Sequence, residues 1–212
     1  MKDIIIVAII GYLFGNIQSS YLLGRLIRKT DIRTLGQGNA GASNAVVSLG
    51  WKFGALVAFI DILKGVISIL LVKRFFEAGF DSDGAVLLYV NGYSAILGHI
   101  YPFYMNFKGG KGTATLIGIL LGINPLYGVI SILIIAGVTF ASDYIVIGTL
   151  ALTLYVVFVT LFKDLGTIPL VISLLGAVLS LKLHIPNYRR ILDGTETRLS
   201  EVLKKSKDKK DS

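Results

Sequence analysis

Uncharged, apolar runs alternate with short polar segments along most of the chain, and this pattern predicts membrane-spanning helices. A run of about 20 apolar residues can cross a bilayer as a helix, because a helix satisfies its own backbone hydrogen bonds. The run at 113–142 is too long for one crossing, and Asn124-Pro125 divides it into a hairpin. The pattern therefore predicts an all-α, polytopic membrane protein with about seven transmembrane helices. The expected spans are 4–24, 53–72, 85–107, the two arms of 113–142, 144–162 and 165–181.

The composition agrees with this class of protein. Hydrophobic residues make up 54% of the 212 residues, and the mean hydropathy of +0.74 is too high for a soluble domain. We expect one membrane-embedded domain over 1–192, followed by a charged, disordered tail over 193–212. The absence of cysteine excludes disulfides and thiolate metal sites, and with two histidines no metal site is expected.

Basic residues gather on one side of the predicted topology. Four lysines and arginines lie in 25–45, two in 108–112 and nine in 182–210, against four in the segments of the opposite side. The positive-inside rule then places the N-terminus outside and the C-terminus in the cytoplasm. The net charge of +8 is interpreted as orientation and attraction to anionic membrane lipid, with no nucleic-acid partner.

A glycine-rich loop at 107–115 separates two apolar runs. Glycines lack a Cβ, so successive N–H groups can turn inward around an anion, and a helix starting at Thr113 would present its positive dipole end at the same point. Two lysines add mobile positive charge. We predict a phosphate or acyl-phosphate site here; the alternative is a flexible cytoplasmic turn whose lysines only set the topology. The candidate residues are Lys108, Gly109, Gly110, Lys111 and Gly112.

A second glycine-rich polar stretch, 36–44, also precedes an apolar run. It is either a turn that ends in a helix N-cap at Ser43 or Asn44, or a second oxyanion site made of backbone N–H groups. The candidate residues are Gly38, Asn39, Gly41, Ala42 and Ser43.

Several polar residues lie inside the predicted spans, where an unpaired charge is expensive. Asp61 and Lys64 lie three residues apart on one helix face, and we expect them to form a structural ion pair. His99 is either a satisfied polar group or a site residue. Four polar residues of the first span should face a cavity or another helix rather than lipid. They are Asn16, Gln18, Ser19 and Ser20.

Taken together, these motifs resemble those of the bacterial acyl-phosphate:glycerol-3-phosphate acyltransferases of the inner membrane. The resemblance implies a seven-helix enzyme that transfers a fatty acyl group from acyl phosphate to the 1-hydroxyl of glycerol 3-phosphate, giving lysophosphatidic acid. It also implies that no CoA, acyl-carrier protein, metal or other cofactor is needed. The matching stretches follow the family's order over nearly the whole chain: Gly36–Asn44, Asp61-Ile62-Leu63-Lys64-Gly65, Gly98-His99-Ile100-Tyr101-Pro102, Phe107–Thr115, and His184 with Asn187, Arg190 and Gly194-Thr195-Glu196.

A direct transfer between the two substrates is the mechanism that the residues favour. No Ser-His-Asp or Cys-His nucleophile set can be assembled, and acyl phosphate is already activated. On this hypothesis Lys111 and the glycines at 109, 110 and 112 hold one phosphate, while residues 38–43 hold the acyl-phosphate end. His184 and Asn187 hold or polarise the acceptor, and either His184 or a substrate phosphate takes the proton.

The chain departs from the family pattern at five places. Gln37 and Val146 stand where serine is usual, and Val47 and Ile185 stand where arginine is usual. The sequence at 16–18 replaces a Ser-x-Pro. Two cations and two hydroxyls near the expected phosphate sites are therefore missing. The alternatives are a small transporter, or a catalytically weak membrane protein that binds lipid or phosphate.

Overall fold

The computed structural model describes residues 1–208, and in that range every regular element is a helix, as predicted. In chain order these are α1 (Lys2–Gly15), α2 (Ser19–Arg28), the 3-10 helix η1 (Ile32–Thr34), α3 (Ala42–Leu49), α4 (Trp51–Phe76), α5 (Ser82–Ile100), the 3-10 helix η2 (Phe103–Met105), α6 (Thr113–Ile123), α7 (Pro125–Ser142), α8 (Ile145–Phe162), α9 (Thr167–Leu192) and α10 (Leu199–Asp208).

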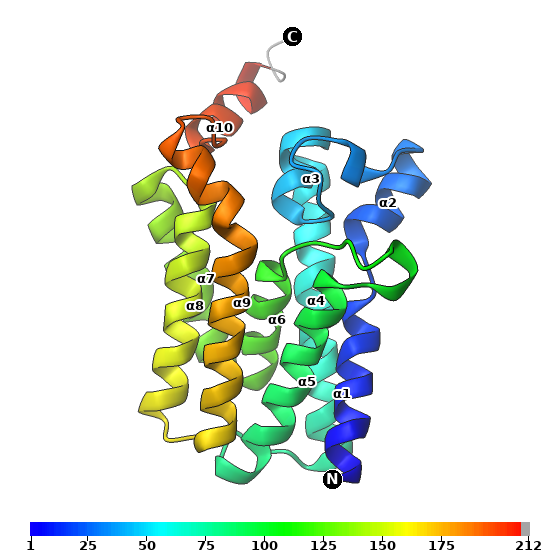
Figure 1. Cartoon of the computed structure of the whole chain (residues 1–212), viewed down its shortest axis with the longest axis vertical. Helices are drawn as coiled ribbons and strands as arrows, with labels where there is room; N and C mark the ends of the chain where they lie inside the picture. The colour runs from blue at the N-terminus through cyan, green and yellow to red at the C-terminus, as the bar shows by residue number, and fades with distance from the viewer. Residues whose placement is uncertain (209–212) are drawn as a thin grey trace.

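The long helices form one bundle with roughly parallel axes (Figure 1). The N-terminus lies at one end of the bundle, the same end as the α4–α5 and α8–α9 connections. The elements α2, α3 and α10 lie toward the other end, as does the loop between α5 and α6. The glycine-rich stretches from two distant parts of the sequence therefore gather at the same end of the bundle as the end of α9.

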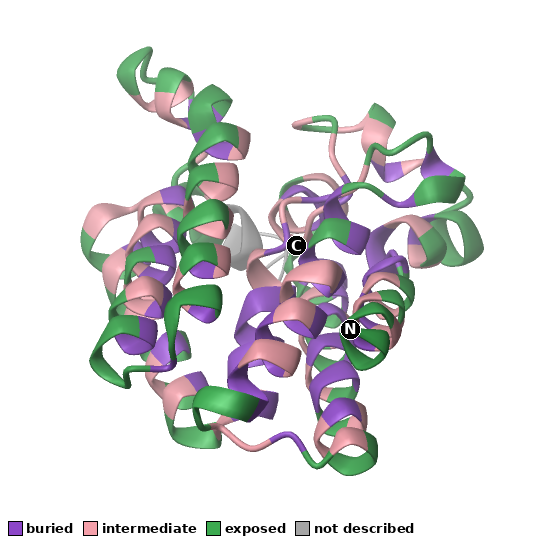
Figure 2. Cartoon of the chain, turned by 60° about the horizontal axis from the view of Figure 1, so that its bottom comes forward, coloured by how far each residue is buried: buried purple, intermediate pink, exposed green. Residues whose placement is uncertain are grey.

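Five helical segments are long and apolar enough to cross a membrane: Lys2–Arg28, Trp51–Phe76, Pro125–Ser142, Ile145–Phe162 and Thr167–Leu192. Their outer surfaces are apolar as well, since large side chains such as Phe59, Phe140 and Phe158 are 61–69% exposed. In Figure 2 exposed positions lie on the outward sides of the outer helices, while buried positions gather toward the middle. An exposed apolar surface of this extent suits contact with lipid.

Glycines set the closest helix crossings. A Cβ at Gly15 of α1 would overlap the carbonyl oxygen of Ala95 on α5, and a Cβ at Gly118 of α6 would overlap the carbonyl oxygen of Ile62 on α4. Without side chains at these points the backbones approach closely, which increases the dispersion contacts that drive helix packing in lipid. The pairs α1–α5 and α4–α6 are accordingly among the most closely packed in the bundle.

The first predicted span is two helices, because the chain leaves helical geometry between α1 and α2. Asn16 Oδ1 accepts a hydrogen bond from the Phe103 N–H at 3.0 Å, and the Tyr104 hydroxyl donates to the Asn16 carbonyl at 2.7 Å. Lys64 Nζ donates to the Ile17 carbonyl at 2.7 Å. The four polar residues of this span are buried, which confirms that they face protein and not lipid.

Prolines mark two helix ends. Helix α5 stops at Ile100, short of the expected end of this span at 107, because Pro102 two residues later cannot continue a helix. The hairpin predicted in 113–142 consists of α6 and α7, and Asn124 Oδ1 accepts a hydrogen bond from the Leu126 N–H at 2.9 Å. Pro125 occupies the first turn of α7, where its missing N–H would have no partner anyway.

The segment expected to be a disordered tail contains α10 instead. Asp143, between α7 and α8, binds the start of this helix: its carboxylate accepts hydrogen bonds from the Ser200 N–H at 2.8 Å and the Ser200 hydroxyl at 2.6 Å. These hydrogen bonds lower the pKa of Asp143. The charge pattern of the tail did not indicate this partner, because it lies far away in the sequence. The last four residues of the predicted tail lie outside the described residues.

Candidate active site

A cavity of about 190 Å³ lies among residues of helices α3 to α9. Its walls are polar where the helix ends meet and aliphatic elsewhere, with Ile117, Ile135 and Ile145 among the apolar lining residues. Eight of the predicted site residues line it: Asn39, Gly41, Ala42, Ser43, Lys111, Gly112, His184 and Asn187.

The N-terminus of α6 opens onto this cavity. Gly112 is the N-cap, with φ +82°, a left-handed conformation that glycine adopts without strain. It supplies no side-chain cap, so the first N–H groups of α6, which lack intrahelical partners, are left for a ligand. Gly112, Thr113 and Ala114 all line the cavity. Together with the helix dipole, this geometry is that of an anion site.

The N-terminus of α3 opens onto the same cavity. Its N-cap, Gly41, also supplies no side-chain cap, and Gly41, Ala42 and Ser43 line the cavity. Asn39 Oδ1 accepts a hydrogen bond from the Gly41 N–H at 3.0 Å, which fixes the turn before the helix. Two helix N-termini from distant parts of the chain thus face one space, so the cavity can hold two anionic groups.

Lys111 is held at the cavity by a group of polar side chains from the end of α9 and beyond. Its Nζ donates to Asn187 Oδ1, and Asn187 Nδ2 in turn donates to Glu196 Oε1 at 2.8 Å. Arg190 Nε binds the other oxygen of Glu196 at 2.6 Å, and Gln37 Nε2 lies 3.3 Å from Glu196 Oε1. Glu196 therefore orients three groups around the lysine.

The charge on Lys111 survives this burial. Desolvation, followed by the nearby positive charge of Arg190, lowers the pKa of Lys111 to about 8, while Glu196 opposes the shift. The lysine is therefore still mainly protonated at pH 7 and brings a positive charge into the cavity.

His184 lines the cavity from α9 and is 5% exposed. Its Nδ1 lies 2.8 Å from the Ser180 carbonyl, which can only accept a hydrogen bond. The neutral ring therefore carries its proton on Nδ1, and Nε2 is the atom left to accept a proton or a hydrogen bond.

Four predicted site residues are not among the residues that line the cavity: Gly38, Lys108, Gly109 and Gly110. Lys108 is exposed. The N–H of Gly109 donates to the Ile100 carbonyl at 2.9 Å, and that of Gly110 donates to the His99 carbonyl at 3.1 Å. The N–H of Gly38 donates to the Leu35 carbonyl at 3.0 Å. These N–H groups are already paired, so the prediction that they hold phosphate is not supported by the geometry.

The glycines at 109 and 110 have a packing role. A Cβ at Gly110 would overlap Nε2 of the His99 ring, and a Cβ at Gly109 would overlap the His99 carbonyl oxygen. The loop can lie against α5 only because both positions lack side chains, and this contact fixes the residues that follow, Lys111 and Gly112.

A Gly110→Ala variant is expected to lose about 1–3 kcal/mol of stability, because the added methyl group overpacks a buried site. It should also lose turnover as the loop is displaced. The matched control is Gly137→Ala in α7, where an added Cβ meets no atom within 4 Å. Thermal unfolding midpoints in detergent compare the two; equal midpoints would contradict the packing role.

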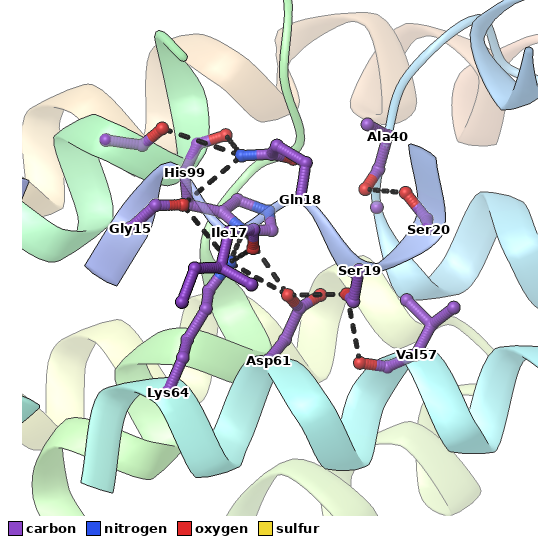
Figure 3. Close-up of polar contacts among 12 residues, drawn as sticks. Gly15, Ile17, Gln18, Ser19, Ser20, Ala40, Val57, Asp61, Lys64 and His99 are labelled. Atoms are coloured by element: carbon purple, nitrogen blue, oxygen red, sulfur yellow. Dashed lines mark hydrogen bonds and ion pairs between the residues drawn. The ribbon is translucent and has the colours of Figure 1, made fainter. Parts of the chain in front are cut away.

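A buried polar network includes two of the residues that line the cavity, Asp61 and His99 (Figure 3). Lys64 Nζ lies 2.9 Å from Asp61 Oδ1, which confirms the predicted ion pair, and 2.8 Å from His99 Nδ1. Gln18 Nε2 donates to the His99 carbonyl at 2.7 Å. Asp61 and His99 also line the cavity, so His99 is both a satisfied polar group and a cavity residue.

The positions that depart from the family pattern fall into two groups. Gln37 and Val146 line the cavity, whereas Val47 and Ile185 are 42% and 44% exposed and are not among its lining residues. Sequence reasoning gave no role to Glu196, although its carboxylate joins the groups around Lys111. The only feature of the sequence that pointed to Glu196 was its place in the last of the motifs that match the family.

An apolar helical bundle with two helix N-termini and a half-buried lysine around one cavity defines a membrane protein that acts on anionic substrates. The sequence model of the glycerol-3-phosphate acyltransferase family matches residues 5–194. The chain belongs to this family.

Individual relatives agree with that assignment. The chain is 37% identical over 204 residues to glycerol-3-phosphate acyltransferase 1 of Oceanobacillus iheyensis, covering 95% of this chain and 97% of the relative. Two crystal structures of PlsY, an integral membrane glycerol 3-phosphate acyltransferase, are similar in fold. The glycerol 3-phosphate form matches with a TM-score of 0.82 at 31% identity, and the lysophosphatidic acid form with 0.78 at 30%. Each alignment covers 94% of this chain and 98% of the solved chain.

Proposed function

We propose that the protein transfers a fatty acyl group from acyl phosphate to the 1-hydroxyl of glycerol 3-phosphate, giving lysophosphatidic acid and inorganic phosphate. The observation that carries this proposal is the pair of helix N-termini, α3 and α6, that face one cavity beside Lys111. Each substrate carries one phosphate, and the cavity offers two anion sites. The names of the relatives support the acceptor and the product.

The residue roles follow from position. Lys111, Gly112 and the first N–H groups of α6 hold one phosphate, and the charge of Lys111 compensates part of it. The residues at the start of α3 hold the acyl-phosphate end. His184 and Asn187 hold or polarise the acceptor from α9. The aliphatic wall of the cavity suits the start of an acyl chain.

The chemistry is a direct displacement at the acyl carbon. The acceptor oxygen forms a bond to the carbonyl carbon, and the bond from that carbon to the phosphate oxygen breaks, so inorganic phosphate leaves with the electron pair. The hydroxyl proton passes to His184 Nε2 or to a substrate phosphate. The chain contains no cysteine, and the protein contributes mainly by placing two anions together and compensating their repulsion.

A donor comparison tests this function. Purified protein is given glycerol 3-phosphate with either palmitoyl phosphate or palmitoyl-CoA, and lysophosphatidic acid is measured by mass spectrometry. Product from acyl phosphate but not from acyl-CoA supports the proposal. A transporter or an inactive lipid-binding protein leaves acyl phosphate unconverted, and product from acyl-CoA alone would assign another donor.

The proposed topology has seven membrane segments, α1 with α2, then α4 to α9, with the N-terminus outside and the C-terminus in the cytoplasm of a bacterial inner membrane. Its support is the opposite placement of the N-terminus and the basic loops in the bundle, together with the positive-inside rule (Figure 1). In this arrangement the cavity opens near the cytoplasmic end, and the domain over 1–192 contains every residue that lines the cavity, while Glu196 follows it.

Cysteine labelling is expected to confirm this topology. The chain has no native cysteine, so single cysteines at Lys108, Asp193 and Ser82, all exposed, report without background. An impermeant thiol reagent should label the cysteine at Ser82 in spheroplasts and should spare the other two until the membrane is opened. Labelling of all three, or of the reverse set, contradicts the topology.

A further inference from the structure

Asp61 lines the cavity and has an unpaired carboxylate oxygen. Its Oδ1 accepts from the Ser19 hydroxyl at 2.7 Å and binds Lys64 Nζ at 2.9 Å (Figure 3). Its Oδ2 is buried and has no hydrogen-bond partner among the described residues. The side chain is 1% exposed, and Asp61 lines the cavity. A buried acceptor atom without a hydrogen-bond partner is unfavourable, so this oxygen is a candidate to accept a hydrogen bond from a ligand.

The rest of the site defines the ligand. The helix N-termini and Lys111 are donors, which suit phosphate, while Asp61 can only accept. A molecule with a phosphate at one end and a hydroxyl near it satisfies both kinds of group. Asp61 of α4, His184 of α9 and the N-terminus of α6 all line the same cavity. A phosphate at the N-terminus of α6 therefore leaves one hydroxyl for Asp61 and one for His184.

We infer that Asp61 Oδ2 accepts a hydrogen bond from the 2-hydroxyl of glycerol 3-phosphate, the hydroxyl that is not acylated. The reacting hydroxyl gives its proton to His184 Nε2 or to a substrate phosphate, so the Asp61 carboxylate, whose Oδ1 already binds Lys64 and Ser19, is left for the other hydroxyl. The same carboxylate is a strong and rigid hydrogen-bond acceptor. Asp61 thus selects a diol phosphate and turns the 1-hydroxyl toward the acyl carbon. This inference rests on the proposed function and assigns the acceptor contact within it.

The test compares glycerol 3-phosphate with 3-hydroxypropyl phosphate, which lacks only the 2-hydroxyl. For the unmodified protein, kcat/KM is expected to be about 10- to 100-fold lower with the deoxy acceptor, because this acceptor cannot form one hydrogen bond to a charged group. In Asp61→Asn, the donors Lys64 and Ser19 should hold the amide oxygen at the position of Oδ1, which puts the NH2 group at the position of Oδ2. An NH2 group cannot accept a hydrogen bond from the 2-hydroxyl, so the ratio of kcat/KM between the two acceptors should shrink to a few-fold. Ser19→Ala, which removes a partner of Oδ1 only, should keep the ratio of the unmodified protein.

Equal kcat/KM for the two acceptors in the unmodified protein overturns the inference and leaves the acyltransferase function standing. An Asp61→Asn ratio as large as that of the unmodified protein does the same. If the protein acylates neither acceptor, the proposed function itself is contradicted. If Asp61→Asn does not fold, the unmodified protein decides: glycerol 3-phosphate should raise its unfolding midpoint more than the deoxy acceptor, and equal shifts with equal kcat/KM overturn the inference.

Discussion

Replacing Lys111 by alanine is expected to lower kcat/KM for glycerol 3-phosphate by about 100-fold or more, with the larger part of the change in KM. The lysine is partly buried at the N-terminus of α6, and its charge compensates a phosphate in a site with little solvent screening. Removing it leaves that phosphate, and the Asn187 oxygen that Lys111 binds, without a charged donor. Steady-state kinetics with palmitoyl phosphate as donor measures the effect.

The matched control is Lys108→Ala, three residues earlier in the same loop. Lys108 is exposed and is not among the residues that line the cavity, so its charge is screened and should change kcat/KM less than about threefold. Comparable losses in both variants would mean that the loop lysines act only through topology or the general surface charge.

A His184→Ala variant is expected to lose about 100-fold in kcat with a smaller change in KM. The imidazole is buried at the cavity, and its Nδ1–H bond to the Ser180 carbonyl fixes the ring with Nε2 free to accept. Loss of a positioned proton acceptor or polarising group acts on the transition state more than on binding, and general-base contributions are typically 10²–10⁴-fold.

Lys182→Ala on the same helix controls for changes in α9, because Lys182 is exposed. It should keep kcat within a few-fold of the unmodified protein. If His184→Ala turns over within threefold of the unmodified protein, the histidine is a packing residue. A substrate phosphate would then be the proton acceptor.

Sequence pattern predicted most of the helices because burial in lipid imposes a simple rule on the chain. A run of apolar residues without charge must be a helix there, and proline marks where α5 ends and α7 begins. The interruption between α1 and α2 was not predicted. It depends on partners far along the chain, since the Phe103 N–H and Lys64 Nζ bind groups at Asn16 and Ile17.

The site was predicted in part, for a similar reason. The residue types that open a helix onto an anion are visible in sequence, and the starts of α3 and α6 do line the cavity. The partners of a backbone N–H group are not visible. The N–H groups of Gly109 and Gly110 look available for phosphate in the sequence, but in the structure they donate hydrogen bonds to the carbonyls of Ile100 and His99. Glu196 was missed because its role arises from contacts with α9 and Gln37.

Direct transfer at this cavity is tested most directly by following an acyl phosphate labelled in the acyl chain. The purified protein is incubated with it, first without and then with glycerol 3-phosphate, and the label is traced between protein, free fatty acid and lysophosphatidic acid. The proposed mechanism predicts no labelled protein in the first step, and one inorganic phosphate released for each 1-acyl product formed in the second. Stable labelling of the protein without acceptor, or consumption of acyl phosphate without lysophosphatidic acid, would contradict it.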